Sequence, residues 1–240
     1  MPPIPETASG EPRTPRERAR AQTIADIIRL GRQHLARHGA AALSLRAVAR
    51  DLGVVSSAVY RYVGSRDELL TLLLVDAYNN LGDAVDAAVE AVPADESRGR
   101  FAALARAVRG WALQEPARYG LLFGSPVPGY QAPAERTMAP GTRVVGGLVQ
   151  ILDAAHRAGR LRERGPSAVP APLAADLDAI RRELGVDVPD ALLARGALVW
   201  TSLFGAVSFE VFGQYGAGTF SAPDELFEHH IAVLADVAGL

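Results

Sequence analysis

Between positions 44 and 70 the chain combines a central glycine with small, hydroxyl-bearing and arginine side chains, in the order SLRAVARDLGVVSSAVYRYVGSRDELL. Hydroxyl and guanidinium groups donate hydrogen bonds to phosphate oxygens and to base edges. Small residues at the start of a helix allow that helix to approach the bases of a major groove closely. These residue types therefore indicate DNA recognition rather than covalent catalysis.

Two short helices joined by a tight turn must position these side chains. Gly53 stands where the first helix ends, because glycine adopts the left-handed backbone of such a stop without steric cost. Apolar residues recur at spacings of three and four before the turn, as an amphipathic helix requires; they are Leu45, Val48, Ala49 and Leu52. After the turn, Val54, Val59 and Val63 can face inward. The pattern predicts a helix-turn-helix, with a purely structural helical hairpin as the alternative.

A longer helix precedes the motif. Thr14, Pro15 and Glu17 provide a cap, a first-turn proline and the third-position glutamate of a capping box. The helix is expected to run to about His38 and to end at Gly39. Its apolar positions should pack behind the two motif helices; they are Ile24, Ile27, Ile28 and Leu35.

The motif has caps of its own. Ser44 can cap its first helix, and Ser65 with Glu68 forms a second capping box. A helix over about 66–92 should follow that box. The helix that ends near His38 and the two motif helices together predict a three-helix head over residues 14–64, preceded by a disordered arm at 1–13.

Charge is distributed unevenly. Residues 1–66 hold 11 arginines and 5 acidic residues, whereas the whole chain holds 25 basic and 27 acidic residues. A basic head gains affinity for phosphates by releasing counterions from DNA. The alternative is an arginine-coated, solvated surface, and the adjacent helix-turn-helix favours DNA.

Composition excludes several other classes. The chain has no cysteine and hence neither disulfides nor a thiolate metal site. No apolar run reaches the roughly 18 residues of a membrane span, and the N-terminus lacks a signal-peptide core. We therefore expect a cytoplasmic protein without membrane contact.

The remaining residues, 65–240, predict a larger helical body and an all-α fold. Further helical patterns lie near 97–114, 116–123, 135–159, 172–184, 189–212 and 224–238. Asp224 is the expected cap of the last one. The last two helices carry more apolar surface than one body needs, so a homodimer through them is expected.

One further pattern runs through the three predicted helices of the head and the start of the next helix. It consists of Ile24, Ile27, Gly39, Ser44, Val48, Ala49, Leu52, Gly53, Val54, Tyr60, Tyr62, Arg66, Glu68 and Leu69. Through them the segment from about Gln22 to Ala77 resembles the tetracycline-repressor family of bacterial transcription regulators. The body is similar to the WHG-type C-terminal ligand-binding domain of that family. Two sets of residues carry this likeness: Trp111 with Pro116 and Phe123, and WTSLFG at 200–205 with Ser208 and Glu210. The resemblance implies a homodimer that binds a palindromic operator in double-stranded DNA until a small-molecule effector enters the body.

The resemblance also implies roles at the DNA. Ser44, Arg46 and Tyr60 should bind phosphate, although Tyr60 could instead be a core aromatic beneath the motif. Arg66 replaces the family's usual lysine at a helix start, where phosphate is its expected partner. The surface that faces the bases should comprise Val55, Ser56, Ser57, Ala58, Arg61 and Tyr62. Arg61 has either a guanine or a phosphate as its partner.

Besides Arg66, four positions depart from the family's pattern. Val55 replaces the usual serine or threonine, Ser57 a common glycine, and Val63 a phenylalanine. Because valine cannot cap, Ser56 could cap instead and move the start of the recognition helix by one residue. Phe204 stands where related bodies often have histidine.

Eight residues are candidates for a ligand pocket, with ordinary core packing as the alternative for the aromatic ones. They are Trp111, Tyr119, Phe123, Met138, His156, Trp200, Phe204 and Glu210. His229 and His230 do not predict a metal site, because adjacent residues point about 100° apart on a helix and no cysteine or other histidine lies near them in sequence. No cofactor motif or hydrolase motif is present.

The sequence thus predicts a DNA-binding transcriptional regulator without enzymatic activity, most simply a repressor that a small apolar ligand releases from its operator. A DNA-binding or architectural protein that ignores ligands is the alternative. An enzyme or carrier that uses the apolar body is a third hypothesis.

Overall fold

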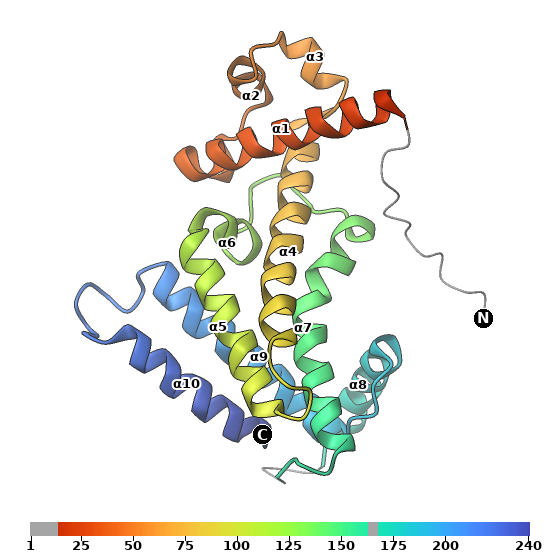
Figure 1. Ribbon diagram of the computed structural model, residues 1–240, viewed down its shortest axis with the longest axis vertical. Coiled ribbons are helices and arrows are strands. Elements are labelled where there is room, and N and C mark those ends of the chain that lie inside the picture. Colours follow the sequence, from red (N-terminus) through yellow and green to blue (C-terminus); the bar gives the residue numbers. More distant parts are fainter. Residues whose placement is uncertain (1–13, 163–167) are drawn as a thin grey trace. The chain divides into compact units, whose positions relative to one another are not determined.

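The structure is a computed structural model that describes residues 14–162 and 168–240, and these residues form helices and no strand (Figure 1). The all-α prediction is confirmed. The expected disordered arm at 1–13 lies outside the described residues. The chain divides into two compact units. The first runs through Leu74 and includes Pro126–Ala132, and the second comprises Val75–Ser125 and Pro133–Leu240. The first unit thus extends beyond the predicted border at position 64.

The first unit begins with α1 (Pro15–His38), whose predicted borders are confirmed. The Thr14 backbone N–H donates to the Glu17 carboxylate at 2.9 Å, and the Glu17 N–H donates to the Thr14 hydroxyl at 3.2 Å. Gly39 ends the helix at a φ of 73°. The two hydrogen bonds between Thr14 and Glu17 satisfy backbone donors that the first turn of a helix leaves without partners.

The helix-turn-helix consists of α2 (Leu45–Asp51) and α3 (Ser56–Tyr60), which follow the short 3-10 helix η1 (Ala40–Ala42). Helices of this length are not stable alone, because nucleation costs more than a few hydrogen bonds return. Packing against α1 compensates, since Ile27, Val48 and Val59 are all at most 1% exposed. A hydrogen bond of 2.8 Å between His34 Nε2 and Asp51 Oδ2 also ties α1 to α2.

The turn contains Gly53 with a φ of 76°, as the sequence predicts. The expected cap at Ser56 is wrong: α3 begins at Ser56, and Val55 occupies the N-cap position without a side-chain bond. Ser44 likewise occupies the N-cap of α2 without a side-chain bond, so its predicted capping bond is absent. In the next cap, the Glu68 N–H donates to the Ser65 hydroxyl at 3.0 Å, which is one of the two bonds of the expected capping box.

α4 (Arg66–Glu90) starts in the first unit and continues in the second. The second unit adds α5 (Ser97–Gln114), α6 (Pro116–Phe123), α7 (Ala134–Arg157), α8 (Ala171–Leu184), α9 (Asp190–Val211) and α10 (Pro223–Ala238). These bounds lie within two residues of the predicted patterns. α5, α7 and α9 pack on one another, α10 covers α5 and α9, and α8 packs on α9.

α9 has the length and hydropathy of a membrane-spanning helix. The buried helix of a protein core has the same properties. α9 contributes Val199, Leu203 and Val207 to the core of the second unit, each at most 1% exposed.

The N-terminus of α10 differs from the prediction. Ala222 holds the N-cap position, so the expected cap by Asp224 is wrong. Asp224 instead accepts a hydrogen bond of 2.7 Å from Arg109, whose guanidinium also forms a bidentate pair with Glu210. The attraction of these carboxylates raises the pKa of Arg109, which remains charged at all ordinary pH values.

Replacement of Gly53 by alanine should lower the free energy of unfolding by about 1–2 kcal/mol, because an L-residue resists the left-handed conformation. A Cβ at Gly53 would meet no atom within 4 Å, so the cost comes from the backbone alone. Gly64 is the matched control, since its surroundings are equally open and its φ is not positive. Gly64→Ala should leave stability unchanged or raise it by about 0.4–1 kcal/mol. Urea denaturation followed by circular dichroism measures both, and an equal loss in the two variants would contradict this account.

Candidate nucleic-acid interface

The residues expected to face DNA are mostly at the surface of the first unit. Arg46, Val55, Ser57, Tyr60 and Arg61 are exposed. Ser44, Ser56, Ala58 and Tyr62 are half-buried. The backbone thus presents small side chains along α3, which spans only five residues. A helix with small side chains on its exposed side can approach base edges closely.

Tyr60 lies at the surface of the first unit. Its side chain is 46% exposed, so the alternative in which it fills the core beneath the motif is wrong. Val59 fills that place instead, at 1% exposure. The phosphate contact expected of Tyr60 stays a prediction.

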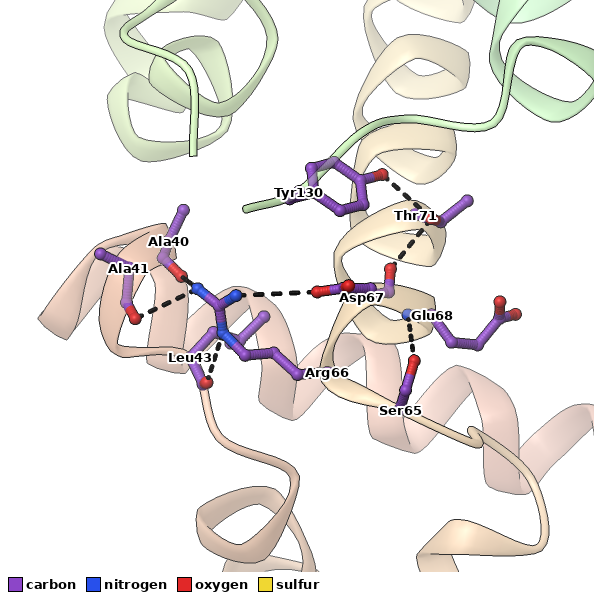
Figure 2. A network of polar contacts seen from close by, with 9 residues as sticks. All are labelled: Ala40, Ala41, Leu43, Ser65, Arg66, Asp67, Glu68, Thr71 and Tyr130. Carbon is purple, nitrogen blue, oxygen red and sulfur yellow. Dashed lines mark hydrogen bonds and ion pairs between the residues drawn. The ribbon is translucent and has the colours of Figure 1, made fainter. Parts of the chain in front are cut away.

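Arg66 has partners inside the first unit (Figure 2). Its guanidinium donates to the carbonyl oxygens of Ala40 at 3.0 Å, Ala41 at 3.1 Å and Leu43 at 3.3 Å. An ion pair of 3.7 Å joins it to Asp67. Arg66 therefore satisfies carbonyl groups at η1, where the chain passes from α1 to α2. The phosphate contact expected of Arg66 stays a prediction, and the structure gives this side chain a second role.

The segment Pro126–Ala132 also belongs to the first unit. In Figure 2 the Tyr130 side chain points toward α4, where its hydroxyl lies 2.9 Å from that of Thr71. Thr71 is buried and also donates to the Asp67 carbonyl oxygen at 2.9 Å. The sequence gives no local signal for this pair, because 59 positions separate its members.

Four of the eight pocket candidates meet in one aromatic cluster of the second unit: Tyr119, Phe123, Trp200 and Phe204. The ring centroids of Phe123 and Phe204 are 4.6 Å apart, and those of Trp200 and Phe204 are 4.1 Å apart. Tyr78 also joins through an edge-on contact with Phe123, which the sequence did not predict. Tyr119 and Phe204 are buried, whereas Trp200 and Phe123 are half-buried.

Tyr119 is the buried polar member of the aromatic cluster. Its hydroxyl donates to the Phe204 carbonyl oxygen at 3.3 Å and lies 2.8 Å from the Ser208 hydroxyl. Burial raises the pKa of Tyr119, and the Ser208 hydrogen bond opposes part of that rise. The phenol is therefore protonated at neutral pH and serves as a donor.

The other four candidates lie apart from the aromatic cluster. The Trp111 indole donates to the Asn80 side chain at 2.8 Å and contacts the Arg118 guanidinium. Glu210 pairs with Arg109, Met138 is 55% exposed, and His156 lies in the last turn of α7. Helical spacing in the sequence could not distinguish these four residues from the four in the aromatic cluster, because spacing does not say which neighbouring helix covers each face.

Residues 14–162 and 168–240 contain no group of three metal-ligating side chains. His229 and His230 lie on α10 beside a groove toward α9.

Comparison with known proteins connects this arrangement to a family. The family described as bacterial regulatory proteins, tetR family, matches residues 27–73, and the tetracyclin repressor-like C-terminal domain matches residues 101–234. The HTH-type transcriptional regulator Rv1816 of Mycobacterium tuberculosis H37Rv is 51% identical over 225 residues, which cover 92% of this chain and 96% of that protein. The chain belongs to the tetracycline-repressor family. It is a DNA-binding transcriptional regulator, as the sequence predicts.

Solved structures share the fold of this chain. The crystal structure of SCO4313 is 35% identical, has a TM-score of 0.75, and the match covers 93% of this chain and all of that one. PfmR of Thermus thermophilus, a TetR family transcriptional regulator, has a TM-score of 0.54 at 18% identity, with 87% and 96% of the two chains covered. At that identity the likeness shows the shared fold alone.

Arg66 and Arg46 should respond differently to alanine substitution. Arg66→Ala removes three bonds to carbonyl oxygens and should lower the free energy of unfolding by about 1–3 kcal/mol. Arg46 is exposed, so Arg46→Ala should change stability by less than about 0.5 kcal/mol while lowering the salt slope of DNA binding by about 0.9 per protomer. Chemical denaturation and binding titrations at several salt concentrations measure both effects. A fully stable Arg66→Ala protein would contradict the structural role.

Proposed function

We propose that this regulator is a homodimeric, cytoplasmic repressor without enzymatic activity, which leaves a palindromic operator when a small apolar ligand binds its second unit. The observation that carries the dimer is an apolar groove of about 610 Å³ between α9 and α10. Its lining includes Phe209 at 48% exposure and Val233 at 44%. Apolar surface of this kind is costly in water, and a partner removes the cost.

A second copy of the chain is the partner that fits this groove best. A two-fold dimer buries the same patch on both protomers, so one apolar face suffices to close the assembly. Two copies of α3 then address two half-sites of opposite orientation, which makes the operator a palindrome.

The aromatic cluster around Phe204 supports a small apolar ligand. Ligand sites are mostly apolar with a few fixed polar groups, and the cluster combines tilted aromatic rings in contact with the Tyr119 and Ser208 hydroxyls. Trp200 and Phe123 are half-buried, so these two rings are the members of the cluster that a ligand would reach first.

The operator is the first target of experiment. The protein should select a palindromic duplex from the DNA that flanks its own gene, and a screen of small apolar compounds against that complex should yield one that releases the DNA. Ser57→Ala and Arg61→Ala should change the preferred sequence, because both side chains are exposed at or beside α3. An unchanged sequence preference would remove them from the base-facing surface. Binding without release by any compound would instead favour a DNA-binding protein that ignores ligands.

The dimer surface has a matched control. Val233 on α10 and Ile180 on α8 are 44% and 43% exposed, so an aspartate should cost the folded protomer about equally at either position. Val233→Asp should convert the dimer to monomers and lower operator affinity, since burial of an unpaired carboxylate in an interface is unfavourable. Ile180→Asp should leave the dimer intact. Sedimentation equilibrium measures the outcome, and dissociation in neither variant would place the dimer interface elsewhere.

A further inference from the structure

The face of α1 that packs on the helix-turn-helix carries arginine side chains in the N-terminal turns of α1. Ile27 is fully buried, and Thr23, one turn earlier, lines a groove with Ala58 and Tyr62. Arg20 and Arg16 follow at spacings of three and four, which keep all four side chains on one face of the helix. The face thus changes from apolar to cationic where the protein core ends.

Arg20 is held beside the recognition helix by an aromatic ring. Its guanidinium carbon lies 5.5 Å from the ring centroid of Tyr62, two residues past the end of α3. A cation over the face of a tyrosine ring is attracted by the ring quadrupole. The contact fixes the direction of a long side chain that would otherwise sample many rotamers.

Within residues 14–162 and 168–240, no acidic side chain pairs with the two arginines of this edge. Arg16 and Arg20 are exposed, and among the residues that the structure describes neither forms an ion pair. Glu17 is the acidic residue nearest to them in sequence, and its carboxylate accepts the Thr14 N–H within the capping box. Two guanidinium groups therefore remain available to an external anion.

The external anion that best matches Arg16 and Arg20 is the phosphate backbone of the operator. The major groove is about 12 Å wide and phosphates border it on both sides. A side chain stacked on Tyr62, directly after the helix that faces the groove, lies close to that border. Guanidinium groups bind phosphate through short, charge-assisted hydrogen bonds.

We propose that Arg16 and Arg20 form a second DNA-binding edge, which binds phosphates that flank the base pairs facing α3 in each half-site. The edge rests on the operator binding proposed above. It lengthens the footprint of each protomer beyond the helix-turn-helix and adds affinity that does not depend on base sequence.

Two double variants test the edge on the duplex that the unmodified protein selects. Arg16→Ala/Arg20→Ala removes the edge. Arg18→Ala/Arg29→Ala removes two charges from the opposite side of α1, at helical angles of roughly 200° and 220° from Arg16. Both variants keep the capping box and replace arginine with a good helix former, so circular dichroism should match the unmodified protein.

The salt dependence of binding gives the decisive reading. The slope of log affinity against log salt should fall by about 1.8 per protomer in Arg16→Ala/Arg20→Ala, which is about 0.9 for each lost phosphate contact. Hydroxyl-radical footprints should lose protection at the outer deoxyriboses of each half-site, next to the phosphates that the edge binds, and keep it at the centre. Arg18→Ala/Arg29→Ala should retain the original slope and footprint.

Other results overturn the inference in distinguishable ways. An unchanged slope in Arg16→Ala/Arg20→Ala shows that the edge does not contact DNA. Equal losses in both double variants show that only net charge matters. If the unmodified protein selects no duplex, the operator proposal itself fails and the edge fails with it.

Discussion

The guanidinium of Arg66 binds three carbonyl oxygens at the point where α1 gives way to α2, and the geometry of the helix-turn-helix depends on these hydrogen bonds. α2 and α3 have seven and five residues, which is too short for independent stability. Their positions follow from what holds their ends. Arg66 fixes the entry to α2 and Gly53 permits the turn to α3, while Ile27 and Val48 supply the buried contact between α1 and α2.

Local chemistry explains which parts of this fold the sequence predicts. The Thr14–Glu17 capping box and the glycine at 53 act within four residues, so their effects could be predicted without the rest of the protein. The cap at Asp224 failed because a distant group competed: Arg109 binds that carboxylate from α5. Likewise, the interior partners of Arg66 lie more than 20 positions away, where periodicity carries no information.

The second unit shows the same limit for aromatic residues. Helical spacing predicts that Trp111, Tyr119 and Phe204 face inward, and all three are buried. Spacing cannot say that Phe204 contacts the ring of Phe123 while the Trp111 indole donates to Asn80. Those choices depend on how α5, α6 and α9 pack, and only the packed helices define which rings share one cluster.

The hydroxyl pair of Thr71 and Tyr130 has a consequence for how such regulators exchange parts. The first unit is assembled from two stretches of chain, because Pro126–Ala132 joins residues far earlier in the sequence. In a chimera with a single crossover near Leu74, Thr71 would face another protein's loop and would keep this bond only if that loop supplied a hydroxyl in the place of Tyr130. Recombination between relatives would have to transplant both stretches together, so modular inheritance of the DNA-binding part is less free than its position at one end of the sequence suggests.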